Sequence, residues 1–179
     1  RIITGLAQLG GQTVMIVSQD SSESNNSAEG LTSTDFRKCT RAIKIASRFN
    51  IPIVTFIDTV GHNMSYEEEL KGIGISLGET MLAMAELPSP SISILIGTGG
   101  NESALTLDIS DRRLMLENSI LVLGDNRDDN DELNKPTIIG ASECKDLNII
   151  DAVIPEPVGG IHLNPDECFS LLRKFLLEL

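Results

Sequence analysis

Two short strand-like runs, each followed by a glycine-rich turn, constrain the fold more than any other feature of this sequence. The run 51–57 is nearly all apolar, as expected of a strand that is covered on both faces, and 91–96 is a second run of strand length. Each run leads through its turn into a segment with helical periodicity. This alternation predicts an α/β domain in which helices pack on the faces of a sheet.

The remaining segments continue the same rhythm. Further strands are predicted at 2–9, 13–18, 113–116, 120–123 and 149–154, the first two joined as a hairpin by Gly10-Gly11. Helices are predicted after a cap at 32–34, and at 66–87, 102–107, 141–147 and 165–179. The first helix has an apolar stripe of Phe36, Cys39, Ile43, Ala46 and Phe49. Residues 19–31, rich in Ser, Asn and Glu, are predicted to form a long mobile loop.

Length and charge limit the classes of protein that remain. The 179 residues, 41% of them hydrophobic, predict one domain over 1–179 with a sizeable core. A net charge of -12 and the lack of a 20-residue apolar run disfavour nucleic acid and membranes as partners. Three widely spaced cysteines without CxxC pairs fit the reducing cytoplasm. Because the sequence opens at Arg1 without a methionine, we expect that an N-terminal part is missing.

The two glycine-rich turns are the first candidates for a binding site. They read Asp58-Thr59-Val60-Gly61 and Gly97-Thr98-Gly99-Gly100, and each precedes a predicted helix. In open α/β sheets such strand ends bind ligands, because free amide groups at a helix start can hold an oxyanion. The alternative is that these glycines only permit tight turns. Neither turn matches a nucleotide-binding fingerprint.

Three polar features admit both a functional and a structural interpretation. His62 could carry a proton, but no partner for it is identifiable and a turn residue is the simpler interpretation. Asp58 is expected to bond the amides of its own turn. The acidic stretch 124–135 contains Asp125, Asp128, Asp129, Asp131 and Glu132, but not in the spacing of a calcium loop. We therefore predict a solvated acidic loop and no metal site.

Four sequence blocks carry a resemblance to a known family. The blocks FNIPIVTFIDTVGH (49–62), IGTGGNESAL (96–105), RLMLENSILVL (113–123) and IIDAVIPEPVGGIHLNP (149–165) resemble the carboxyltransferase α subunit of bacterial acetyl-CoA carboxylase. The resemblance implies a crotonase-like fold, a spiral of strand-strand-helix turns. It also implies a role in fatty acid biosynthesis within an oligomer, where a zinc-bearing β subunit completes the site. The helices 66–87 and 165–179 are the candidate interfaces.

The same resemblance implies the reaction and its residues. Biotin, carboxylated on a partner biotin carboxyl carrier protein, would give its carboxyl group to acetyl-CoA, with no cofactor bound covalently to this chain. Gly61 with His62, and Gly99 with Gly100, are the implied backbone donors to developing negative charge. The substrate-binding residues would be those that follow in the second turn, Asn101, Glu102 and Ser103.

Departures from the family pattern leave two alternatives open. The family reads DTPGAYPG and GEGGSGGAL, whereas this chain has DTVGHNMS and GTGGNESAL. A Glu102 carboxylate about 4 Å from an oxyanion would oppose it by about 4 kcal/mol at an effective dielectric of about 20, although Glu102 could equally be a solvated cap. One alternative is a catalytically impaired paralogue that acts as a scaffold or regulatory subunit. The other is a subunit of a malonyl-thioester decarboxylase.

Overall fold

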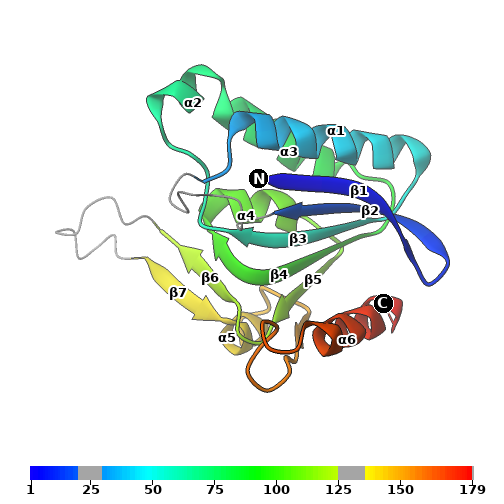
Figure 1. The fold of residues 1–179 in the computed structure, drawn as a ribbon. Helices are drawn as coiled ribbons and strands as arrows, with labels where there is room; N and C mark the ends of the chain where they lie inside the picture. The colour runs from blue at the N-terminus through cyan, green and yellow to red at the C-terminus, as the bar shows by residue number, and fades with distance from the viewer. Residues whose placement is uncertain (20–29, 125–135, 179) are drawn as a thin grey trace.

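The chain forms a mixed sheet whose central strands are parallel, as the sequence predicts (Figure 1). A computed structural model describes residues 1–19, 30–124 and 136–178. The sheet has the order β1 (Ile2–Leu9), β2 (Gln12–Gln19), β3 (Ile53–Thr59), β4 (Ser91–Gly100), β5 (Arg112–Leu116) and β8 (Ala152–Ile154). Strands β1 and β2 pair antiparallel around Gly10-Gly11, which confirms the predicted hairpin. The other neighbours along this order pair parallel.

A second, smaller branch of the sheet starts at the end of β4. Strand β5 pairs with Ile92–Leu95, and β6 (Ile120–Leu123) then pairs with Thr98–Gly100. Strand β7 (Thr137–Gly140), which the sequence analysis missed, adds antiparallel to β6. The predicted turn at 97–100 is therefore wrong. These residues stay extended because β3 and β6 pair with them, and the helix begins directly after them.

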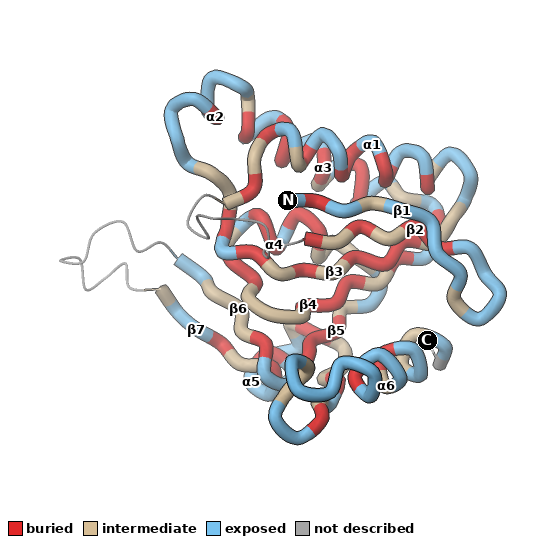
Figure 2. Tube along the Cα trace, in the orientation of Figure 1, coloured by how far each residue is buried: buried red, intermediate tan, exposed pale blue. Residues whose placement is uncertain are grey.

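Two apolar cores lie on opposite faces of the sheet (Figures 1 and 2). Helices α1 (Ser33–Phe49), α3 (Ile73–Ala85) and α4 (Asn101–Asp108) contribute to the first core, together with Ile53 and Ile57 of β3. Helix α6 (Pro165–Glu178) covers the second core through Cys168 and Leu172, where Val54 of β3 points. Successive residues of β3 thus face opposite cores, as in a strand covered on both sides.

Helix α1 confirms most of its predicted pattern. Thr32 is the N-cap, and Phe36, Cys39, Ile43 and Ala46 are all buried. The fifth member of the predicted stripe, Phe49, is 66% exposed, because it is the last residue of the helix and lies beyond the sheet-facing surface.

The predicted helix 66–87 is in fact two helices. Helix α2 (Tyr66–Leu70) ends at Lys71, and α3 starts after Gly72, whose φ of 75° is left-handed. That conformation breaks a helix and favours glycine. Met84 of α3 is buried. The other boundaries differ mainly at their ends, since α5 (Ala141–Asp146) and β8 are shorter than predicted.

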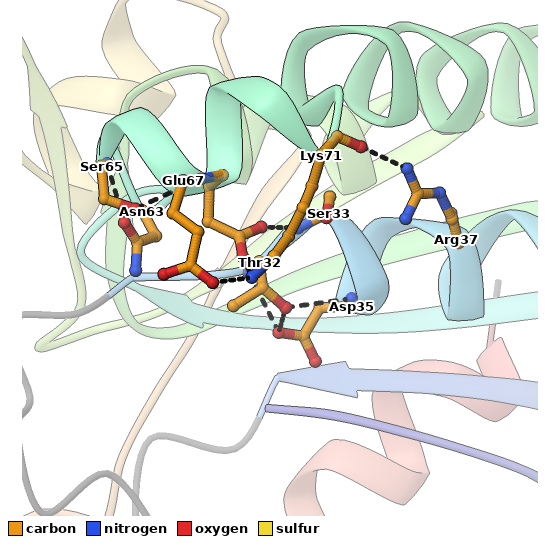
Figure 3. Close-up of polar contacts among 9 residues, drawn as sticks. Thr32, Ser33, Asp35, Arg37, Asn63, Ser65, Glu67 and Lys71 are labelled. Carbon is orange, nitrogen blue, oxygen red and sulfur yellow. Dashed lines mark hydrogen bonds and ion pairs between the residues drawn. The ribbon is translucent and has the colours of Figure 1, made fainter.

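A network of polar contacts fastens α2 to the start of α1 (Figure 3). Glu68 accepts a hydrogen bond from the amide of Ser33 at 2.8 Å and contacts Lys71 Nζ at 2.9 Å. Its side chain is almost completely buried. The bond from the Ser33 amide, followed by the one from Lys71, lowers the pKa of Glu68. The carboxylate therefore stays charged and holds the loop between β3 and α2 in place.

Two predictions fall outside the described residues. They are most of the loop 19–31, at residues 20–29, and the acidic stretch, at residues 125–135. In the described part of the chain, no helix combines the length and the apolar character needed to cross a lipid bilayer.

Candidate functional site

The end of β3 forms the first half of the candidate site. Gly61 has a φ of 138°, and its amide donates to Thr59 Oγ1 at 3.1 Å. Its carbonyl accepts from the amide of Leu31 at 2.9 Å, and the amide of Asn63 donates to the Leu31 carbonyl at 2.8 Å. These bonds on either side of His62 fix the backbone of the turn, and they occupy the amide of Gly61 within the chain.

Glycine is required at the end of β4 because the first turn passes directly over it. A Cβ atom on Gly100 would lie 2.4 Å from the carbonyl oxygen of Val60. A Cβ atom on Gly97 would equally overlap the carboxylate of Asp58, whose Oδ1 accepts from the amide of Thr98 at 3.0 Å. The Asp58 carboxylate therefore bonds across to β4, whereas the sequence predicted bonds to the amides of its own turn. The two glycine-rich segments therefore converge.

The second half of the site is the start of α4. Asn101, its first residue, has a left-handed φ of 49°, which lets the chain turn sharply from strand to helix. The N-cap residue Gly100 offers no side chain to the free amides. Because the first amides of an α-helix have no acceptor within the helix, those of Asn101, Glu102 and Ser103 point out of the helix start, where its dipole is positive. This arrangement suits an anionic group.

A contact between side chains joins the two halves. His62 Nδ1 lies 3.0 Å from Glu102 Oε1, with the imidazole 12% exposed and the Glu102 side chain 46% exposed. The angle at the ring does not satisfy a hydrogen bond, so Nδ1 counts as a buried nitrogen without a hydrogen-bond partner in the described structure. The sequence analysis found no partner for His62, and the structure supplies Glu102. The Glu102 charge is accordingly directed at an imidazole.

Ser103 is the third residue of α4. Its side chain is fully buried, and its hydroxyl is another buried polar atom without a hydrogen-bond partner among the described residues. Gly99 lies inside the sheet, paired with Thr59 of β3 and Leu121 of β6. Of the seven predicted site residues, Asn101 at the uncapped start of α4 is half-buried and Glu102 is exposed, whereas Ser103 and the three glycines are buried.

Two large cavities in the described part of the chain do not include residues of α4 in their lining. One of about 660 Å³ is bordered by Gly97, Glu117, Glu156 and His162, and another of about 600 Å³ lies near Pro88 and Arg112. His162 is exposed there. No group of three or more His, Cys, Asp or Glu side chains in residues 1–19, 30–124 and 136–178 is arranged to hold a metal ion.

Comparison with known proteins assigns the chain to a family. All of residues 1–179 match the family described as acetyl co-enzyme A carboxylase carboxyltransferase-like. The α subunit of acetyl-coenzyme A carboxylase carboxyl transferase from Francisella philomiragia is 34% identical over 188 residues. The chain belongs to the acetyl-CoA carboxylase carboxyltransferase family. The corresponding subunit of Nitrosomonas europaea is also 34% identical, over 192 residues.

Coverage is unequal between this carboxyltransferase-family chain and its relatives. The two alignments include 97% and 99% of the chain but 60% of each relative. The chain thus spans about 60% of the length of the curated relatives that it matches.

Solved structures confirm the crotonase-like fold. A transcarboxylase 12S structure with methylmalonyl-coenzyme A bound superposes with a TM-score of 0.72 at 20% identity, over 86% of the chain and 33% of that protein. A Pseudomonas malonate decarboxylase hetero-tetramer in complex with malonate superposes with a TM-score of 0.81 at 14% identity, over 99% of the chain and 77% of that protein. At such identities the likeness establishes the fold of this carboxyltransferase-family chain.

Proposed function

We propose that this chain is the α-type carboxyltransferase subunit of a biotin-dependent acetyl-CoA carboxylase. It would transfer the carboxyl group from carboxybiotin, presented by a biotin carboxyl carrier protein, to acetyl-CoA. Membership of the family supports the reaction. The observation that carries the proposal is the convergence of the turn after β3 with the end of β4, where Gly100 meets the Val60 carbonyl at the uncapped start of α4.

The chemistry needs donors where negative charge develops. Charge appears on the ureido oxygen of biotin when CO2 leaves, and on the thioester oxygen when the acetyl methyl group loses a proton. We assign the stabilisation of one of these oxygens to the amides of Asn101, Glu102 and Ser103, with His62, Gly61 and the glycine pair Gly99-Gly100 shaping the site around them. Removal of one such donor typically costs about 100-fold to 1000-fold in rate.

A second chain would complete the site. Neither the cavity of about 660 Å³ nor that of about 600 Å³ is bordered by residues of α4, and we propose that a wall from another subunit encloses a substrate there. Large apolar side chains are exposed from the end of β3 to the start of α3: Val60, Met64, Tyr66, Leu70 and Ile75. We propose that this surface binds a β subunit of the zinc-bearing type, and we place the assembly in the cytoplasm.

The proposal is tested by co-expression with the carboxyltransferase β subunit encoded in the same genome. The two chains should co-purify, and the complex should form acetyl-CoA from malonyl-CoA only when free biotin is present to accept the carboxyl group. Leu70→Glu, at a side chain 70% exposed, should weaken co-purification, whereas Leu6→Glu, at a side chain 62% exposed on β1, should not. A stable complex that transfers no carboxyl group to biotin would overturn the proposal.

The impaired-paralogue alternative rests on Glu102 and Ser103, which stand where the family has glycines. The double variant Glu102→Gly with Ser103→Gly distinguishes it from the enzyme. An impaired paralogue should gain carboxyl transfer in the double variant, while a competent enzyme should already transfer without it. Because Glu102 contacts His62, the structure favours the competent enzyme.

A further inference from the structure

A concentration of positive charge on α1 has no part in the proposed carboxyl transfer. Residues 36–49 contain five of the 14 basic residues of the chain and none of its 26 acidic residues. All five basic residues are exposed. In a chain with a net charge of -12, this one helix face therefore carries a positive field that the rest of the molecule opposes.

Four of the five cations form a row that borders a hollow of about 410 Å³. The members of the row recur every three or four residues, which places them on one face of the helix: Arg37, Arg41, Lys44 and Arg48. Neighbouring members are separated by about 4.5 to 6 Å along the helix axis. The fifth cation, Lys38, is directed elsewhere, because its Nζ donates to the carbonyl of Ile2 on β1.

The other side of the hollow belongs to α3, which packs beside α1 on the same face of the sheet (Figure 1). Glu79 of α3 lines the hollow together with the row, as do Thr40 and Ile45 of α1. The lining thus combines four cations with one carboxylate, and its net charge is positive. It shares no residue with the candidate site at the end of β3 and the start of α4.

The protein does not neutralise the row with its own carboxylates. Arg41, Lys44 and Arg48 take part in none of the ion pairs among residues 1–19, 30–124 and 136–178, and neither does Glu79. Like charges three or four residues apart destabilise a helix. A row of four such charges is therefore unfavourable for α1 by itself, and it is relieved when an external anion binds.

The residue types indicate which anion fits. Three of the four cations are arginines, whose planar guanidinium groups bind phosphate through two parallel hydrogen bonds. The volume of the hollow is in the range of sites for small molecules. A long polyanion would extend over the negative remainder of the chain, whereas a small one would respond mainly to the row, because charges more than about 8 Å away are screened at physiological salt.

We infer that this hollow between α1 and α3 is a binding site for an oligophosphate anion, with two or more linked phosphate groups. Arg41 and Lys44, in the middle of the row, hold the phosphates. Arg37 contributes less, because its guanidinium also donates to the carbonyl of Lys71 (Figure 3). Arg48 borders the other end of the hollow, with its guanidinium carbon 5.9 Å from the centre of the Phe49 ring.

The alternative is that the row is only a solvated helix face. Such a face would attract any anion weakly and in proportion to the net charge of the chain. A binding site would instead depend on particular cations and on the number of linked phosphates. The experiment therefore compares variants of equal charge as well as anions of different length.

The test is calorimetric titration of the full chain with inorganic triphosphate. The wild type should show a single saturable site, and inorganic phosphate, which reaches fewer cations, should bind about 10-fold or more weakly. The double variant Arg41→Gln with Lys44→Gln should weaken triphosphate binding about 10-fold or more. Circular dichroism checks that the variant is folded, which we expect because both side chains are exposed.

The matched control is the double variant Arg173→Gln with Lys174→Gln. It removes the same charge from two exposed cations of α6, which covers the opposite face of the sheet. The dissociation constant of triphosphate should stay within about twofold of the wild-type value, since these cations are far from the hollow and are screened.

Glu79 provides a test in the opposite direction. Glu79→Gln removes the carboxylate from the lining and should tighten triphosphate binding about twofold or more. Glu86→Gln removes an exposed carboxylate at the end of α3 that does not line the hollow, and it should have no such effect.

ATP and CoA identify the source of the phosphates. Equal affinity for triphosphate and ATP would support a site that recognises phosphates alone. Tighter binding of ATP or of CoA, weakened by the Arg41→Gln with Lys44→Gln variant to the same extent as triphosphate binding, would support a site for that ligand.

Two results would overturn the inference. One is the absence of triphosphate binding by the folded wild type. The other is an equal loss of affinity in the α1 and α6 double variants, which would show a response to net charge alone. Neither result depends on carboxyl transfer, so the proposed function is tested separately.

Discussion

The starts of α1 and α4 differ in how their free amide groups are satisfied. At α1, Thr32 and Asp35 form a reciprocal capping box, and the carboxylate of Glu68 accepts from the Ser33 amide. At α4, Gly100 provides no side-chain cap, although Glu102 is close enough in sequence to act as one. The chain thus bonds amides at the start of α1 with its own side chains and provides no side-chain cap at the start of α4, where we propose that an external anionic group binds.

The buried atoms without partners sharpen this difference. At α4 they include His62 Nδ1 and Ser103 Oγ, and at α1 the Ser33 hydroxyl. The backbone amides of Ser33 and Asp35 at the start of α1 are nonetheless bonded to side chains of the chain itself. Unsatisfied buried polar groups destabilise a fold and persist where another requirement maintains them. The region around α4 is therefore where we expect stability and function to conflict.

The largest loss of stability is expected from a substitution at the start of α1. Glu68→Ala removes the acceptor of a buried amide and the partner of Lys71, and should lower the free energy of unfolding by about 2–3 kcal/mol. Because the pKa of Glu68 is lowered in the folded state, its stabilisation is present above the pKa of the unfolded chain. It is lost as pH falls through the folded pKa. Urea unfolding at several pH values measures both effects.

The matched control is the neighbouring Glu67→Ala. Glu67 also contacts Lys71 at 2.9 Å, but its side chain is 78% exposed, so the change should cost about 0.5 kcal/mol or less. Equal losses for the two variants would show that the α1 amide does not depend on Glu68, and the contrast between the helix starts would fail.

The second prediction concerns the pH dependence of stability, which we expect to follow Asp108 at the C-terminal end of α4. Burial raises the pKa of Asp108 from 3.8 to about 6, although a hydrogen bond from Ser93 opposes that shift. The folded chain then holds a proton that the unfolded chain releases between about pH 4 and pH 6, so stability falls as pH rises through this range. Asp108→Asn should remove this dependence and stabilise the protein by up to about 2 kcal/mol above pH 7.

Thermal unfolding from pH 4 to pH 8 measures the slope for the wild type and the variant. Asp108→Ala serves as the control, because it removes the charge and also the acceptor for Ser93. It should flatten the pH dependence without the full gain in stability. An unchanged slope in Asp108→Asn would mean that another group causes the dependence.

Local patterns predicted much of the fold, since they report on residues near one another in sequence. The hairpin at Gly10-Gly11 and the buried face of α1 followed from turn chemistry and helical period. The extension of β4 through Gly100 did not, because it depends on pairing with β3 and with β6. The sequence shows a glycine at position 72, but the apolar residues around it favoured one continuous helix over 66–87.

The candidate site was predictable in position and less so in detail. Glycines after two predicted strands located it, since the ends of parallel strands meet at one edge of a sheet. The contact of His62 with Glu102 joins residues 40 positions apart and has no signal in spacing. The same is true of Gly61, whose amide is occupied by a hydroxyl of its own turn. Side-chain geometry of this kind follows from the assembled fold.

The smallest change in the free energy of unfolding is expected for substitutions of Asn101, and these test the role of the start of α4 most directly. Asn101 and Asn50 have nearly the same left-handed φ, 49° and 53°, at the start of α4 and the end of α1. Replacement by Ala should cost about 1 kcal/mol at either site, because a Cβ-bearing residue without a local hydrogen-bonding side chain is disfavoured there, and replacement by Gly should cost less.

Turnover should separate the two asparagines where stability does not. Asn101→Ala would shift the amides at the start of α4 and reduce biotin-dependent acetyl-CoA formation, whereas Asn101→Gly would keep them in place and retain it. Neither change at Asn50 should alter the rate, because α1 presents no free amides to a substrate. If Asn50→Ala lowered the rate as much as Asn101→Ala, the uncapped start of α4 would have no special part in the reaction, and the two helix starts would differ only in how the chain caps them.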